Sequence, residues 1–341
     1  MQGLSKTRSE LPEMLVLEIL SKLPVKSLTR FRCVCKPWSS SFQTPHFITK
    51  HLHNNNLNVL LKRFCGDTRG GVDCLSQLST VKGRDFSEEE NIHLPFFEIC
   101  WYAPVFDGPC NGILCLHDQH DEATLWNPST REFKILPQSS VQRPPLVDST
   151  RFGGIGFGYD SQTDNYKLVR FVVNYFEEDS DAGSMFDEMD QVELYSLTSD
   201  SWREISYPVV HPYGSPPFNS YVNGFYYWQA IGDPGFLILS FDMVNLTIAS
   251  VWWDFSTILF ATFGLQWIPW CYHLPKGRNS QSSDHELVLF DPCTQELKNL
   301  GIHAYRESMQ IIGYVESLIP INGRSEHEER IIRRPVGGGS N

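Results

Sequence analysis

Two periods of hydrophobic residues divide the chain. Up to about residue 52, apolar side chains recur at helical spacing in short runs that Leu23-Pro24 and Pro37 interrupt. From about residue 95, apolar and polar positions alternate between clusters of Gly, Pro, Asn and Asp, as they do in β-strands joined by turns. The pattern therefore predicts a small all-α module followed by a large all-β domain.

The first predicted helix, residues 11–22, is apolar on most of its sides. Its clearly polar residues are Glu13, Glu18, Ser21 and Lys22. A helix that packs on a surface shows one apolar stripe, so a helix this apolar must be covered on most sides. A module of about 40 residues cannot enclose so much apolar surface by itself. A second covering surface is therefore implied, either a partner protein or the chain's own second domain.

Further helices are expected after this one. Ser27 can cap a helix that carries Leu28 and Phe31, and Pro37 marks another break. Thr44 followed by Pro45 resembles a cap with proline at the first helical position, which predicts a last helix from there.

One hairpin pattern occurs four times in the β-rich part. In each copy an aromatic residue ends one strand, turn formers follow, and a bulky apolar residue stands seven positions after the aromatic one. Recurring hairpins of this kind predict a propeller-like domain, and the alternative is a β-sandwich in which the similarity arose by chance. The expected anchor pairs are Trp126/Phe133, Tyr195/Trp202, Phe241/Ile248 and Phe290/Leu297.

Charge and cysteine content narrow the function classes. Residues 1–62 carry nine Lys and Arg against three Asp and Glu, whereas the remainder carries nineteen against thirty-seven. A body this acidic disfavours nucleic acid, and the basic N-terminal part suits an acidic protein partner. Nine cysteines without a CxxC pair are typical of reduced thiols in the cytosol or nucleus. The apolar run 248–272 is broken by Asp254, Gly264 and Pro269, so we expect buried strands and no membrane span.

No pattern in the sequence predicts catalysis, a metal site or a cofactor. His117 and His120 lie in a polar turn without an indicated distant ligand, and the glycine-rich 153–158 is followed by neither a Lys-Ser/Thr pair nor a helix. The acidic stretch 176–190 is either a solvated loop or a substrate-selective surface, and the Pro-rich loop 141–147 is a further candidate for such a surface. The carboxylates of the acidic stretch are Glu177, Glu178, Asp179, Asp181, Asp187, Glu188 and Asp190.

The sequence LPEMLVLEILSKLPVKSLTRFRCVCKPW resembles the plant F-box, with nearly every landmark at the expected spacing. The resemblance implies a trihelical fold that binds a Skp-type adaptor within a cullin-based ubiquitin ligase. It also implies that the adaptor surface is lined or supported by Leu11, Pro12, Ile19, Leu20, Leu23, Pro24 and Leu28. The residues that would hold the module together are Phe31, Val34 and Trp38.

Stretches such as CNGILCLHD, TLWNPSTREFKILP and GFGYDSQTDNYKLVRF resemble the plant F-box-associated domain, which is kelch-like. Together with LFDPCTQELKNLGI and YVESLIPI, they look most like S-locus F-box and S-locus F-box-like proteins. The resemblance implies that this domain holds a protein target, with an S-RNase in self-incompatibility as the favoured one. Residues 249–283 depart from the family pattern, because one family strand cannot be placed there; a missing blade would leave exposed strand edges.

The resemblance implies a non-catalytic substrate-recognition subunit of a Skp–cullin–F-box ligase, in the cytoplasm or also the nucleus, without a cofactor. One alternative is an interaction protein that does not lead to degradation, or a decayed paralogue that binds the adaptor but no target. Another is an enzyme on a propeller scaffold. The predicted segments are an F-box at 9–52, linker and first irregular strands at 53–94, an F-box-associated domain at 95–320 and a disordered tail at 321–341.

Overall fold

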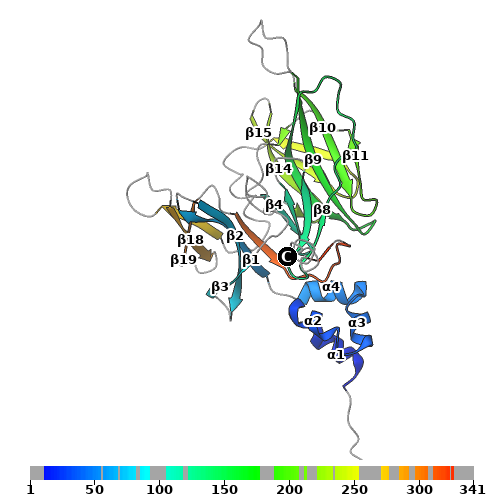
Figure 1. Cartoon of the computed structure of the whole chain (residues 1–341), viewed down its shortest axis with the longest axis vertical. Coiled ribbons are helices and arrows are strands. Elements are labelled where there is room, and N and C mark those ends of the chain that lie inside the picture. The colour runs from blue at the N-terminus through cyan, green and yellow to red at the C-terminus, as the bar shows by residue number, and fades with distance from the viewer. Residues whose placement is uncertain are drawn as a thin grey trace, which may run out of the picture.

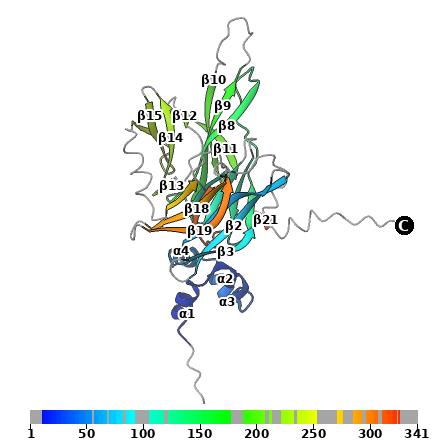
Figure 2. The same ribbon diagram turned by 90° about the vertical axis from the view of Figure 1, so that its left-hand side faces the viewer.

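A helical module lies at one end of a β-rich domain in the computed structural model of the chain (Figures 1 and 2). The structure describes residues 11–54, 57–67, 70–81, 85–92, 105–117, 122–176, 188–206, 211–212, 221–232, 235–252, 270–275, 284–291, 296–305, 310–322 and 324–325. The observations below concern these residues.

The helical module contains four helices where three were expected. They are α1 (Glu13–Leu20), α2 (Val25–Phe31), α3 (Lys36–Ser41) and α4 (Pro45–Asn54). The N-terminal caps of α1 and α2 are Pro12 and Pro24, so the prediction that Ser27 caps the second helix is wrong. The predicted start of the last helix is confirmed, since the backbone N–H of Phe47 donates to Thr44 Oγ1 at 3.3 Å.

The core of this module consists of Leu20, Leu28, Phe42 and Phe47, all nearly inaccessible to solvent. The predicted core residues Phe31 and Trp38 pack against it, with ring centroids 5.9 Å apart. Val34 was expected in the same core, but it is 61% exposed. It lies in the turn after α2, which ends before the helical spacing could carry Val34 inward.

The β domain consists of five antiparallel sheets within the described residues. Sheet A contains β20 (Gln310–Val315), β1 (Leu57–Asp67), β2 (Gly70–Val81) and β3 (Asp85–Ile92). Sheet B contains β21 (Arg324–Ser325), β7 (Glu132–Ile135), β6 (Ala123–Asn127), β5 (Ile113–His117) and β4 (Val105–Cys110). Sheet C contains β11 (Ser201–Ile205), β10 (Glu188–Ser196), β9 (Asn165–Tyr175) and β8 (Ser149–Asp160).

The remaining strands form two sheets. Sheet D contains β12 (His211–Pro212), β13 (Tyr221–Val222), β14 (Phe225–Gly232), β15 (Gly235–Asp242) and β16 (Ile248–Trp252). Sheet E contains β17 (Trp270–Pro275), β18 (Asp284–Asp291) and β19 (Glu296–Tyr305).

The predicted hairpin repeat is confirmed residue by residue. In all four anchor pairs, the aromatic residue and the apolar residue are direct cross-strand partners: Trp126 with Phe133, Tyr195 with Trp202, Phe241 with Ile248, and Phe290 with Leu297. In the first three hairpins the residue five positions after the aromatic one has a positive φ: 60° at Arg131, 49° at Asp200 and 57° at Leu246. The same local pattern therefore folds into the same turn.

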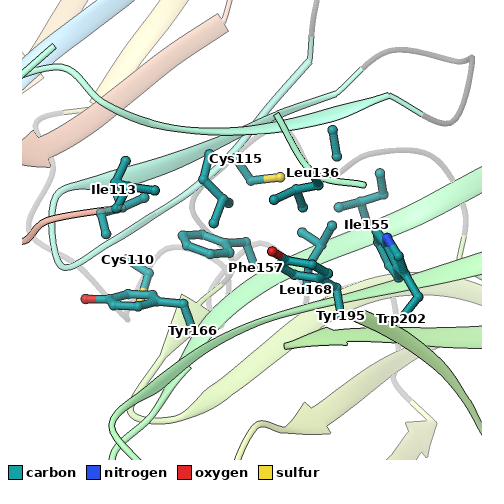
Figure 3. Close-up of a cluster of buried hydrophobic side chains, with 13 residues drawn as sticks. Cys110, Ile113, Cys115, Leu136, Ile155, Phe157, Tyr166, Leu168, Tyr195 and Trp202 are labelled. Carbon is teal, nitrogen blue, oxygen red and sulfur yellow. The ribbon is translucent and has the colours of Figure 1, made fainter. Parts of the chain in front are cut away.

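Three apolar cores separate successive sheets, which decides between the two expected architectures. One core lies between sheets A and B, one between B and C, and one between C and D. Figure 3 shows the second, where Cys115 and Leu136 meet Phe157, Leu168 and Tyr195. A sandwich has one core between two sheets, whereas a propeller has one between each pair of neighbours. The domain is therefore propeller-like, and the sandwich interpretation is wrong.

A close approach of strand to side chain requires glycine in β8. A Cβ on Gly156 would lie 2.4 Å from the Trp228 ring of the next sheet, so a larger residue there would force the sheets apart. Within the glycine-rich stretch, this position therefore permits close packing between sheets C and D.

Two predicted boundaries need correction. Segment 53–94, expected to be linker and first irregular strands, holds the last residues of α4 and three strands of sheet A, of which β2 and β3 pair with a register shift at Gln77 and Leu78. The expected disordered tail begins too early, because Ile321 is buried and β21 pairs with β7. Residues 326–341 lie outside the described part of the chain.

Residues 249–283, where the sequence departs from the family pattern, form strands in both of the segments that the structure describes. Its first residues complete β16 at the edge of sheet D, and residues 270–275 form β17 of sheet E. Residues 253–269 and 276–283 are outside the described residues, so the expectation of a missing blade element stays a prediction.

Candidate functional site

Helix α1 is apolar on two opposite faces. One face turns Leu20, with Val16 and Leu17 beside it, into the core of the module. The other face is open to solvent: Leu11, Met14, Leu15 and Ile19 are 63%, 73%, 52% and 55% exposed. Met14, Leu15 and Ile19 stand at i, i+1 and i+5, which places them on one side of the helix, and Leu11 precedes its cap Pro12. We call this set the α1 apolar face.

The structure divides the predicted adaptor residues into two groups. Leu11, Pro12, Ile19 and Pro24 are exposed, and Leu23 is half-buried. Leu20 and Leu28 are buried within the module, so they can support an adaptor surface but cannot line it. Met14 and Leu15 were missed as site residues, although their helical spacing from Leu11 was the signal that could have found them.

Charged side chains border the α1 apolar face. Glu18 forms ion pairs with Lys50 of α4 and, at 3.5 Å, with Lys22. The hydrogen bond from Lys50 is the largest influence on the pKa of Glu18 and, with the charges of both lysines, it lowers that pKa although burial opposes the shift. A negative charge fixed beside the apolar residues gives a partner a polar reference point.

The chain's own second domain covers one side of the helical module. Leu318 of the β domain packs against the module core, so the chain covers part of the module itself. The α1 apolar face is not covered by the described part of the β domain, since its four side chains are more than half exposed. Burying a large apolar side chain is worth about 1.5–3 kcal/mol, so this face is well suited to bind another protein.

The acidic stretch is only partly described. Glu177, Glu178, Asp179, Asp181 and Asp187 lie outside the described residues, so their role as a recognition surface stays a prediction. Glu188 and Asp190 were expected in the same loop, but they belong to strand β10. There they pair with Tyr175 and Val173 of β9, because the ladder between β9 and β10 extends to the base of this segment.

A better described candidate on the β domain is the loop of residues 137–148, which we call the proline loop. Leu146 at its tip is 89% exposed and has a φ of 68°, a left-handed conformation that costs a leucine about 1–2 kcal/mol. The loop is fixed at both ends, by Trp202 Nε1 donating to the carbonyl of Pro137 at 2.7 Å and by Asp148 N donating to the carbonyl of Tyr175 at 3.0 Å.

A buried charge network holds the middle of the proline loop. Arg143 donates to Glu193, whose carboxylate is inaccessible to solvent, and to Gln191 at 3.2 Å. The same carboxylate accepts a bond from Arg170 Nε at 2.8 Å. The Arg170 guanidinium lies over the rings of Trp202 and Phe152, at 3.9 and 4.4 Å from their centroids. The network attaches an exposed, strained tip to the rigid sheet C.

The described residues contain no cluster of three or more His, Cys, Asp and Glu that could hold a metal ion. His117 pairs with Asp107 at 2.7 Å, and Tyr226 donates to the other oxygen of Asp107 at 2.9 Å, in the interior of the domain. Burial raises the pKa of the Cys110 and Cys115 thiols, which keeps them protonated and weakly nucleophilic. None of the helices described here is both long and apolar enough to span a bilayer.

Two family models match the chain, in the order of its two structural parts. The F-box domain matches residues 9–50, and the F-box associated beta propeller domain matches residues 89–253. The chain thus contains an F-box followed by an F-box-associated domain, and it is homologous to Arabidopsis F-box proteins.

Curated relatives from Arabidopsis thaliana agree with this placement. F-box protein CPR1 is 30% identical over 203 residues, which are 57% of this chain and 45% of the relative. A second F-box protein is 30% identical over 263 residues, 73% of this chain and 65% of the relative, and an F-box/kelch-repeat protein is 29% identical over 245 residues, 68% and 62%. The chain spans about half to two thirds of the length of these relatives.

The matched ranges correspond to different parts of the structure. The F-box match covers α1 to α3 and the first half of α4, and so includes the whole α1 apolar face. The match to the F-box-associated domain covers sheets B, C and D, apart from the short β21. It ends at residue 253, just after β16 and within the stretch in which the sequence departs from the family pattern.

Proposed function

We propose that this F-box protein is the target-binding subunit of a Skp–cullin–F-box ubiquitin ligase. F-box proteins generally act as substrate receptors of such ligases and are typically not catalytic themselves. The observation that carries the proposal is the α1 apolar face, an exposed apolar surface within the F-box. This face binds a Skp-type adaptor and through it a cullin. The β domain holds a protein target beside the ubiquitin-conjugating enzyme that carries the ubiquitin. Proximity then raises the rate of transfer.

The proposal extends to the target and the compartment. The S-locus-like phrases of the β domain favour an S-RNase as the target, in self-incompatibility, and the acidic body favours a basic protein of some kind. Reduced thiols such as Cys110 and Cys115 suit the cytoplasm and the nucleus as locations.

The function is tested by reconstitution with purified Skp-type adaptor, cullin and RING subunits. The full chain should co-purify with the adaptor in equal amounts and support ubiquitin transfer to S-RNase or to a protein captured from pollen or style extract. A chain that captures the adaptor but promotes no transfer to any captured protein would indicate the non-degradative interaction protein or decayed paralogue. Failure to capture the adaptor would overturn the ligase assignment.

The exposed tip of the proline loop is the described part of the β domain that best fits target contact. Replacing Leu146 by Gly removes the exposed side chain and relieves the left-handed strain, so we expect the free energy of unfolding to stay constant or rise by up to about 1 kcal/mol. Capture of the target should nevertheless fall, by about tenfold for one lost apolar anchor. Urea denaturation and a binding titration measure the two effects.

Ile135→Gly provides a comparison, since Ile135 is also an exposed large apolar residue, 54% exposed, but lies in strand β7. It should lower stability through the cost of glycine in a strand and leave target capture unchanged. If Leu146→Gly binds the target as tightly as the wild type, the proline loop is not part of the recognition surface.

A further inference from the structure

Residues 316–321 follow β20 and run between the F-box and the β domain, with alternate residues turned to opposite sides. Glu316 and Leu318 face the F-box. Glu316 Oε2 accepts a hydrogen bond from the backbone N–H of Val25 at 2.7 Å, and this donor has no partner within α2 because it lies in the helix's first turn. Leu318 is partly buried and packs against the F-box core. We call residues 316–321 the clamp segment.

The other side chains of the clamp segment described here, Ser317, Ile319 and Ile321, face the β domain. Ser317 is inaccessible to solvent, and its backbone N–H donates to Ser129 Oγ at 3.1 Å. Ile319 and Ile321 join the core between sheets B and C, and the N–H of Ile321 donates to Glu132 Oε2 at 3.2 Å. Contacts to the F-box and to the β domain therefore alternate along residues 316–319, so one short segment binds both domains at once.

Asn127 is the side chain that holds the clamp segment most directly. Its Nδ2 donates to the carbonyls of both Ser317 and Ile319, each at 3.0 Å. Its Oδ1 accepts from the N–H groups of Ser129 and Thr130, which forms the turn of the first hairpin. Asp242 has the same turn role two sheets away, where its Oδ1 accepts from Val244 and Asn245. An aspartate suffices for the turn alone, whereas the two donated bonds require the amide of asparagine.

The clamp segment passes close to the backbone of Gly112. Gly112 has a φ of 80°, and a Cβ there would lie 2.4 Å from the Val315 carbonyl and 2.5 Å from Ser317 Cβ. The clamp segment meets the F-box at α2 and at its core, on the side of α1 opposite to the α1 apolar face. An adaptor can therefore occupy that face without displacing the clamp segment.

We propose that the clamp segment fixes the orientation of the β domain relative to the F-box, and that Asn127 is its positioning residue. The inference rests on the proposed function in one respect: the fixed orientation presents a bound target, and the chain's own lysines, to the ubiquitin-conjugating enzyme from one direction. Loss of the clamp leaves adaptor binding and target binding intact but makes transfer slower and less selective among lysines.

The test uses Asn127→Asp in the full chain, bound to adaptor, cullin and RING subunits, with the chain's own lysines as the ubiquitin acceptors. Aspartate keeps the turn acceptor and removes both donors to the clamp segment. We expect faster hydrogen exchange at the amides of α2, although residue 127 lies in sheet B, and adaptor affinity within about twofold of the wild type. Transfer to the preferred lysine should fall by about fivefold and spread to further lysines by mass spectrometry. Asp242→Asn, the reverse exchange in the equivalent turn, should change none of these.

The outcomes separate the two proposals. If the wild-type chain does not bind the adaptor, the proposed function fails, while the exchange measurement on the free chain still tests the clamp. Unchanged exchange in α2 of Asn127→Asp overturns the clamp. Faster exchange with an unaltered rate and pattern of lysine modification overturns its role in transfer. Leu318→Ala, which acts from the F-box side of the segment, serves as the second variant if Asn127→Asp does not fold.

Discussion

Replacing Ile19 by Asp is expected to reduce the affinity for a Skp-type adaptor by about 100-fold or more, because it places an unpaired charge within a surface that the adaptor must cover. The side chain is 55% exposed in the free chain, so the F-box itself should fold with nearly unchanged stability. Isothermal titration with the purified adaptor measures the affinity, and thermal denaturation measures the stability. Met14→Asp, at the other end of the α1 apolar face, should act in the same way.

Val251→Asp provides the matched control. Val251 is 57% exposed on β16 of the β domain, so the same change in charge, from a similarly exposed β-branched residue, is made far from the F-box in the sequence and in another domain. It should leave adaptor affinity unchanged. If Ile19→Asp and Val251→Asp bind the adaptor equally well, the α1 apolar face is not the adaptor surface.

The hairpins of the β domain could be predicted from the sequence because their signal is local. The aromatic residue, the turn formers and the second apolar residue lie within a few positions of one another, and all four anchor pairs were found in register. The pairing of β20 with β1 could not be predicted in this way. It joins Leu57 to Val315 across most of the chain, and no local pattern specifies a partner so far away.

The F-box shows a different limit. A helix with apolar residues on both faces gives no internal sign of which face turns inward, so Leu20 and Leu11 received the same role although one is buried and the other exposed. The direction follows from the packing of α1 against Leu28, Phe42 and Phe47, which is tertiary information. Val34 was misplaced because the end of α2 could not be located closely enough.

The charge network of sheet C was not foreseen either. Arg170 and Glu193 are direct cross-strand partners, and both are almost inaccessible to solvent. Alternation of polar and apolar residues places charges on the water side of a strand, but β9 is a central strand that is covered on both faces. The polar residues of β9 are therefore buried on whichever face of the sheet they lie. Only hydrogen bonds and ion pairs with partners offset the cost of burying them.

Removing one partner of this network is expected to have the largest effect on stability. Arg170→Met leaves the buried Glu193 carboxylate with Arg143 alone and removes the cation over Trp202, so the free energy of unfolding should fall by about 3–5 kcal/mol. For a domain of this size that corresponds to a decrease in Tm of roughly 10 °C. Lys134→Met breaks the more exposed pair with Asp200 and should cost less than about 1 kcal/mol.

The double variant Arg170→Met, Glu193→Leu separates stability from function. With both buried charges replaced by apolar side chains, no carboxylate is left unpaired, and most of the lost stability should return. Arg143 then keeps only its hydrogen bond to Gln191, so the middle of the proline loop is held less firmly to sheet C. We expect target capture to be weaker than in the wild type although thermal denaturation is close to that of the wild type. If target capture is also at the wild-type level, the network serves only the fold, and the strained conformation of Leu146 requires a different explanation.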